Sequence, residues 1–202
     1  MGISPGDFEQ MKKRVGGGAR TARPIVHVSA GATASAHQII LGVDPSLRGT
    51  GFGIIRLGRP SAQVLAQGTI SCPAGWERSR CLLRITETLR EVIRSHRPTA
   101  CAIEGIFYVQ NLQTAIIMGE ARGAALVAAA EGGLDIFEIA TRKVKQAIVG
   151  YGAAQKLAVA KMVQRMLNLA EVPAADPADA LALALTFALE KNGLGLSQPK
   201  KI

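Results

Sequence analysis

Five short runs rich in branched apolar residues organise the chain from residue 38 onward. Their lengths are typical of strands buried in a sheet, and a Pro-Ser turn signal follows the first of them. Short connections join the first three runs, which is typical of an antiparallel meander. The predicted strands cover residues 38–44, 50–57, 62–71, 100–104 and 134–140.

Apolar residues at helical spacing fill the segments between and after these strands. An amphipathic helix is predicted from Glu77 to His96, and Pro98 stops it. An Ala-rich helix is expected at 111–131, and helical patterns after the fifth strand lead to a last helix at 177–190. Strands that alternate with helices after a meander predict an α/β domain, with helices on both faces of a mixed central β-sheet.

Two glycines, Gly119 and Gly123, lie four residues apart inside the predicted helix at 111–131. Small residues at this spacing favour close packing of the helix on the sheet. A subunit interface is the alternative.

The length of 202 residues favours one domain with a substantial core. We expect a globular unit at 38–190, a disordered basic arm at 1–37 and a flexible basic tail at 191–202. Three cysteines without a C-x-x-C pair suggest neither a disulfide framework nor a zinc site, and they favour the bacterial cytosol. No apolar run approaches the roughly 18 residues that a membrane-spanning helix needs.

The net charge of +9 indicates a polyanionic partner such as nucleic acid. The arm and the tail each contribute +3, yet a basic segment remains inside the domain. The alternative is a solvated helical surface on which the cations happen to cluster, and nucleic acid is the favoured interpretation. The segment's six basic residues, without any acid between residues 139 and 170, are Arg142, Lys143, Lys145, Lys156, Lys161 and Arg165.

Two carboxylates, Asp44 and Glu104, each end a strand that is predicted to be buried. An unpaired buried carboxylate costs several kcal/mol, so this placement requires a function. Ligands of α/β sheets collect outside the carboxyl ends of the strands. If the two strands are neighbours, both side chains point into one site.

Two further carboxylates, Asp176 and Asp179, precede the apolar last helix. Asp176 before Pro177 fits an N-cap, and Asp179 then falls at the third helical position, which favours the helix dipole. Alternatively, the pair adds oxygen donors to Asp44 and Glu104. Four carboxylates would suit two Mg²⁺ ions, with Mn²⁺ as an alternative, and such a centre hydrolyses phosphodiesters.

Five segments, in order, resemble the RuvC family of Holliday junction resolvases, and the resemblance extends over residues 38–190. They are GVDPSLRGTGFG at 42–53, IEGIF at 103–107, GEARG at 119–123, VKQAIVG at 144–150 and DPADALALA at 176–184. This resemblance implies an RNase H-like fold and a homodimer that makes paired symmetrical nicks in four-way junction DNA, in recombination and repair. Partners would be branch-migration motors of the RuvA/RuvB type.

The resemblance also implies roles for single residues. Asp44, Glu104, Asp176 and Asp179 would be the catalytic and metal-binding acids. Lys145 and Lys156 match basic positions that would contact DNA, and Arg142 and Lys143 belong to the same basic segment. Phe107 matches an aromatic residue that packs on an unpaired base, and the adjacent Tyr108 would share this role.

Ser46-Leu47 departs from the small Gly-Ser pair that many members of the family carry, and the N-terminal arm has no counterpart in the pattern. Three alternatives stay open at this stage. One is an actin- or Hsp70-like ATPase, since Arg48-Gly-Thr-Gly51 after Asp44 resembles its first phosphate loop. The others are a DNA-binding module without catalysis and a general ribonuclease that acts on RNA–DNA hybrids.

Overall fold

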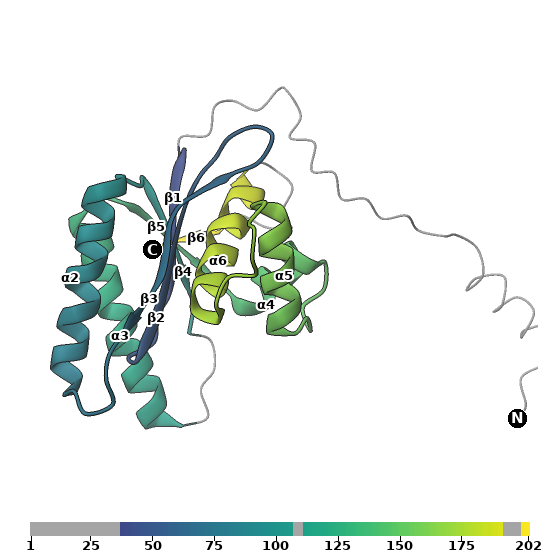
Figure 1. Cartoon of the computed structure of the whole chain (residues 1–202). Coiled ribbons are helices and arrows are strands. Elements are labelled where there is room, and N and C mark those ends of the chain that lie inside the picture. The colour runs from purple at the N-terminus through teal and green to yellow at the C-terminus, as the bar shows by residue number, and fades with distance from the viewer. Residues whose placement is uncertain (1–36, 107–110, 192–198) are drawn as a thin grey trace, which may run out of the picture. The chain divides into compact units, whose positions relative to one another are not determined.

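A six-stranded sheet in the order β3-β2-β1-β4-β5-β6 forms the centre of the domain, and helices cover both of its faces (Figure 1). This computed structural model describes residues 37–106, 111–191 and 199–202. Phe107 and Tyr108, the predicted base-contacting aromatic residues, lie outside these ranges. The predicted α/β class with a mixed sheet is confirmed.

The predicted strands are confirmed to within two residues. β1 (Ile39–Asp44), β2 (Gly49–Arg56) and β3 (Gln63–Ser71) form the antiparallel meander. β4 (Ala100–Glu104) runs parallel to β1, and β5 (Asp135–Ile139) runs parallel to β4. The carboxyl ends of β1, β4 and β5 therefore lie at the same edge of the sheet.

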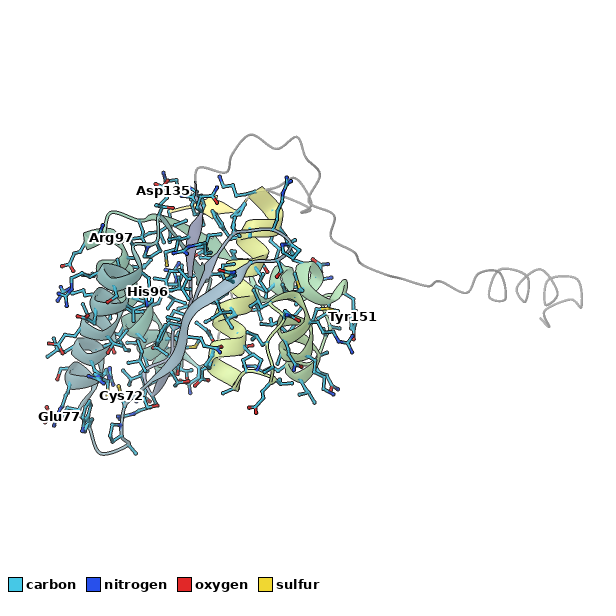
Figure 2. The ribbon with its side chains drawn as sticks, turned by 45° about the horizontal axis from the view of Figure 1, so that its top comes forward. Cys72, Glu77, His96, Arg97, Asp135 and Tyr151 are labelled. Atoms are coloured by element: carbon cyan, nitrogen blue, oxygen red, sulfur yellow. The ribbon has the colours of Figure 1, made fainter. Side chains whose placement is uncertain are left out.

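The last residues of the chain differ from the flexible tail that the sequence predicts. β6 (Lys200–Lys201) pairs antiparallel with β5. Lys201 Nζ lies 2.5 Å from Asp135 Oδ1. Asp135 and Arg97 mark this end of the domain in Figure 2, while Cys72 and Glu77 lie at the other end. Backbone pairing and this ion pair hold the C-terminus at the edge of the sheet.

The helices form two layers (Figure 1). α2 (Arg78–His96) and α3 (Leu112–Glu131) pack on one face of the sheet, and α4 (Thr141–Val149), α5 (Lys156–Met166) and α6 (Ala175–Lys191) pack on the other. Successive residues of β1 alternate between the two cores, with Ile40 on the α6 side and Leu41 on the α2 side. Burial on both faces explains why β1 and β4 are continuously apolar up to the carboxylates that end them.

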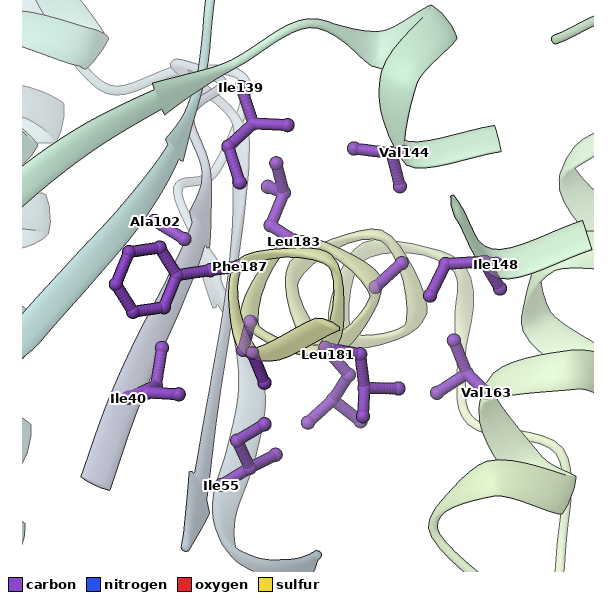
Figure 3. Close-up of a cluster of buried hydrophobic side chains, with 14 of the residues drawn as sticks. Ile40, Ile55, Ala102, Ile139, Val144, Ile148, Val163, Leu181, Leu183 and Phe187 are labelled. Atoms are coloured by element: carbon purple, nitrogen blue, oxygen red, sulfur yellow. The ribbon is translucent and has the colours of Figure 1, made fainter. Parts of the chain in front are cut away.

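Helix α6 packs on the sheet with almost no space between the two backbones. Its Leu181 and Phe187 are central to the core on that side (Figure 3). A Cβ atom on Gly42 of β1 would lie 1.9 Å from the carbonyl oxygen of Ala180, and one on Gly51 of β2 would lie 2.2 Å from that of Asp176. These glycines fix the position of the helix that carries Asp176 and Asp179.

Among the helices in the described part of the chain, none is both long and apolar enough to cross a membrane.

Candidate active site

Asp44 and Glu104 meet at the carboxyl ends of two paired strands. The parallel register Val43↔Ile103 puts the two acids side by side. Their side chains share a hydrogen bond and line one cavity. The predicted convergence of these two acids is therefore present in the structure.

The turn after Asp44 is closed by a buried threonine. Thr50 Oγ1 donates to the carbonyl oxygen of Ser46 over 2.6 Å and accepts from the Ser46 amide over 3.2 Å. Leu47 packs with Cys72 and Cys81 in a small apolar cluster. The unusual Ser46-Leu47 pair is thus accommodated by packing, and it leaves the carboxylate of Asp44 in the cavity.

Asp179 reaches the same cavity from the first part of α6. Its Oδ2 lies 2.7 Å from the ammonium of Lys156, the first residue of α5. The sequence therefore brings a third carboxylate and a basic residue to Asp44 and Glu104, from segments that lie more than 50 positions further along the chain.

Asp176 occupies a different place from the one predicted. The amide of Ala178 donates to the carbonyl oxygen of Ala174, so the helix begins before Asp176, and this residue is not the N-cap. Pro177 is accommodated because amides of the first helical turn have no partner within the helix. Asp176 Oδ2 accepts from Thr69 Oγ1 of β3 over 3.1 Å. Asp176 is not one of the described residues that line the cavity.

Helix α4 contributes Thr141 and Lys145 to the cavity. Thr141 Oγ1 donates to Glu104 Oε1 over 2.5 Å and so fixes the orientation of that carboxylate. Sequence reasoning missed Thr141. The available signal was its position two residues after β5, whose carboxyl end lies at the same edge of the sheet as those of β1 and β4.

The other predicted basic contacts lie elsewhere. Lys143 Nζ is 2.7 Å from Glu190 Oε1, and the carboxylate of Glu190 is buried, so this ion pair fastens α4 to α6. Arg142 is exposed, and its aliphatic part lies against Gly152. Lys145 and Lys156 are therefore the predicted DNA contacts that line the cavity, while Arg142 and Lys143 are not among its described lining residues.

The cavity holds more negative charge than its own cations offset. Burial, followed by the hydrogen bond and charge of Glu104 and the charge of Asp179, raises the pKa of Asp44 to about 8, although Lys156 lowers it. The hydrogen bond to Asp179 raises the pKa of Lys156, and the charges of Asp44 and Glu104 add to the effect. The proton that Asp44 retains and the ammonium group of Lys156 therefore offset the repulsion between the three acids.

This donor set fits a hard divalent cation, because all three acids offer oxygen ligands and their mutual repulsion would be relieved by positive charge. Within residues 37–106, 111–191 and 199–202, no group of three acidic, His or Cys side chains already has the arrangement of a metal site. Lys156 occupies an oxygen of Asp179, and Asp44 is hydrogen-bonded to Glu104.

This chain is similar to proteins of one known family. Residues 40–187 match the family "Crossover junction endodeoxyribonuclease RuvC". The protein of that name from Akkermansia muciniphila is 46% identical over 155 residues, which cover 77% of this chain and 93% of the relative. The relative from Rubrobacter xylanophilus is 39% identical over 167 residues, which cover 81% and 93%.

A solved structure shows that the similarity extends from the sequence to the fold. T. thermophilus RuvC in complex with a Holliday junction substrate superposes with a TM-score of 0.73 and 34% sequence identity, over 81% of this chain and all of that one. The predicted RNase H-like fold is thereby confirmed. The segment matched by the family, residues 40–187, contains β1 from Ile40 onward, all of β2 to β5 and every acid of the cavity. This chain therefore belongs to the family of crossover junction endodeoxyribonucleases RuvC.

Proposed function

We propose that this chain resolves Holliday junctions, cutting four-way DNA by paired symmetrical nicks during recombination and repair. The observation that carries the proposal is the meeting of Asp44, Glu104 and Asp179 in one cavity beside Lys145 and Lys156. A relative with the same fold is known in complex with a Holliday junction substrate. Membership of the RuvC family favours this function over the actin- or Hsp70-like alternative.

We propose Mg²⁺ as the cofactor, with two ions per site and Mn²⁺ as a substitute. Asp44, Glu104 and Asp179 would hold the metal, and Asp176 would be the fourth ligand. Because Thr69 engages Asp176, we expect this acid to contribute less than Asp179. When bound, the ions would activate water and stabilise the charge on the departing oxygen.

The chain's own groups have separate tasks in this proposal. Thr141 holds the Glu104 carboxylate in one orientation. Lys156 compensates the charge of Asp179, and its side chain is largely exposed, so its ammonium is available to an incoming phosphate. Lys145 presents a second cation to the DNA backbone at the same cavity.

Cleavage assays on three substrates test the function. A four-way junction, a linear duplex and an RNA–DNA hybrid are incubated with the full chain, in Mg²⁺ and separately in EDTA. We expect metal-dependent cutting of the junction at symmetrical positions. Cutting of the hybrid alone would instead identify a general ribonuclease, and binding without any cutting would identify a DNA-binding module.

Lys145 gives a prediction about DNA binding. Lys145→Ala should weaken junction binding and reduce the slope of log affinity against log salt by about one, because one phosphate contact is lost. The measurement is a salt titration of junction affinity by fluorescence anisotropy. Arg90→Ala is the control, since Arg90 lies on α2 in the opposite helical layer and pairs with Glu131. An unchanged slope for Lys145→Ala would exclude the contact.

The homodimer implied by the family has a candidate interface on α3. Leu112, Ile116 and Val127 lie on one stripe of this helix and are 77%, 49% and 50% exposed. Gly119 and Gly123 lie on the same stripe, and a Cβ atom at either position would meet no described atom within 4 Å. The predicted packing of these glycines on the sheet is therefore wrong. We propose that the stripe contacts a second copy of this chain.

Val127→Glu tests the interface. Because a symmetric dimer would bury two unpaired carboxylates, the substitution should weaken dimerisation by roughly 100-fold or more. Sedimentation equilibrium measures the dissociation constant. Leu157→Glu serves as the control, because Leu157 is 60% exposed on α5 in the other layer. Equal dimer affinity in the wild type and Val127→Glu would contradict the interface.

Partners of the RuvA/RuvB type and a location in the bacterial cytosol stay predictions.

A further inference from the structure

Arg122, in the middle of α3, contacts the strand that carries Glu104 from the face opposite the cavity. Its Nε donates to the main-chain carbonyl oxygen of Glu104 over 3.2 Å. Thr141 holds the carboxylate of the same residue on the α4 side. Glu104 is thus fixed from both faces of the sheet, at its side chain by Thr141 and at its backbone by Arg122.

The carbonyl of Glu104 needs such a donor because the strand ladder ends beside it. If the register Val43↔Ile103 is extended by two residues, residue 45 lies opposite Gly105. In a parallel ladder with this register, the amide of residue 45 would donate to the carbonyl oxygen of Glu104. Residue 45 is a proline and has no N–H group. Arg122 therefore supplies the hydrogen bond that Pro45 withholds at the strand end.

The guanidinium group is itself fastened to the sheet. Arg122 Nη2 lies 2.5 Å from Glu138 Oε2 of β5, and the two side chains are only 16% and 20% exposed. The group also lies near the interior of β4: burial raises the pKa of the Cys101 thiol to about 12, and the charge of Arg122 opposes that rise. A half-buried Arg with a carboxylate partner and a backbone acceptor is well constrained.

We propose that Arg122 is a positioning residue for the metal site, which fixes the end of β4 so that the Glu104 carboxylate faces Asp44. Arg122 does not line the cavity, so its action passes through the backbone of Glu104. The inference rests on the proposed function, since it assigns Glu104 to metal binding. It predicts that loss of Arg122 weakens metal affinity and leaves the affinity for DNA intact.

Metal titration of the full-length protein without DNA tests the inference. Mg²⁺ and Mn²⁺ are titrated into wild type and Arg122→Gln, with calorimetry and the shift of the melting temperature as readouts. Residues that orient a metal ligand typically account for 10–100-fold in affinity, so we expect about tenfold weaker binding by Arg122→Gln. Arg122→Lys should recover part of the affinity, because an ammonium can still donate to the carbonyl. Junction affinity in EDTA should equal that of the wild type.

Arg90→Gln is the matched control, because Arg90 forms a two-bond pair with Glu131 between α2 and α3, at 2.6 and 2.8 Å, away from the cavity. Its metal affinity should equal that of the wild type. Metal affinity of Arg122→Gln within twofold of the wild-type value would overturn the inference. An equal loss of metal affinity in Arg90→Gln would also overturn the inference. The loss would then come from weakened packing between α2 and α3 and not from the contact of Arg122 with Glu104.

Glu138→Gln decides the question if Arg122→Gln fails to fold. It leaves Arg122 in place but removes its ionic partner, so a smaller loss of metal affinity in the same direction is expected, and no loss overturns the inference. The junction cleavage assay with wild-type protein remains a separate test. A protein that binds metal through an Arg122-dependent site but cuts no junction would contradict the proposed function alone.

Discussion

Replacement of Asp44 by asparagine is expected to reduce junction cleavage by more than roughly 100-fold. Loss of a residue that only orients a metal ligand costs up to about 100-fold, and loss of the ligand itself should cost more. Asparagine keeps the shape of the side chain but removes the charge that would hold the cation. Asp44 is also the acid on which the other two act, because the charges of Glu104 and Asp179 both raise its pKa. Junction affinity should persist, because the contacts of Lys145 and Lys156 with phosphate remain.

Single-turnover cleavage and junction binding are measured in parallel for Asp44→Asn. Asp135→Asn is a suitable control, because Asp135 begins β5 at the opposite end of the sheet (Figure 2). Cleavage by Asp44→Asn at the wild-type rate would refute the proposed site.

The same substitution should stabilise the metal-free protein at alkaline pH. The pKa of Asp44 in the fold is about 8, against 3.8 for an unperturbed Asp. Between these values the unfolded chain releases the proton that the folded chain retains, so the free energy of unfolding falls as pH rises from about 4 to about 8. Asparagine removes this loss. Urea unfolding in EDTA should therefore show a gain for Asp44→Asn at pH 8 that shrinks towards pH 4.

Addition of metal should reverse that order of stability. A cation that binds the folded state alone stabilises it, and the wild type has the full set of acids to bind it. Mg²⁺ should raise the melting temperature of the wild type much more than that of Asp44→Asn. A melting temperature that responds equally in both proteins would place the metal elsewhere.

Gly42→Ala is expected to have the largest effect on stability, a loss of about 3 kcal/mol or more in the free energy of unfolding. The added methyl group would lie 1.9 Å from the carbonyl oxygen of Ala180, and two packed backbones would have to separate. Because α6 carries Asp176 and Asp179, cleavage should also fall at temperatures where the variant is still folded.

Urea unfolding followed by circular dichroism measures the effect of Gly42→Ala. Gly75→Ala is the control, since a Cβ atom at Gly75 would meet no atom of the described chain within 4 Å. Its stability should stay near the wild-type value. A loss below 1 kcal/mol for Gly42→Ala would show that α6 can shift away from β1 without cost.

The sequence by itself determined the class of fold and the position of two acids. Apolar runs and helical spacing are local properties, so they located β1 to β5 to within two residues, whereas the two-residue β6 has no such pattern and was missed. Asp44 and Glu104 were identified for a physical reason that needs no coordinates, because a carboxylate at the end of a buried strand requires compensation. Their adjacency followed once β1 and β4 were paired.

The tertiary structure alone decided how the other candidates are arranged. Asp176 contacts Thr69, which lies 107 positions away in sequence, while Asp179 reaches the cavity, and the start of α6 at Ala175 sets this difference. Arg122 and Thr141 could be connected to Glu104 only after α3 and α4 were packed on the sheet. Side-chain direction and long-range contacts depend on how the helices pack, and neither composition nor periodicity records that packing.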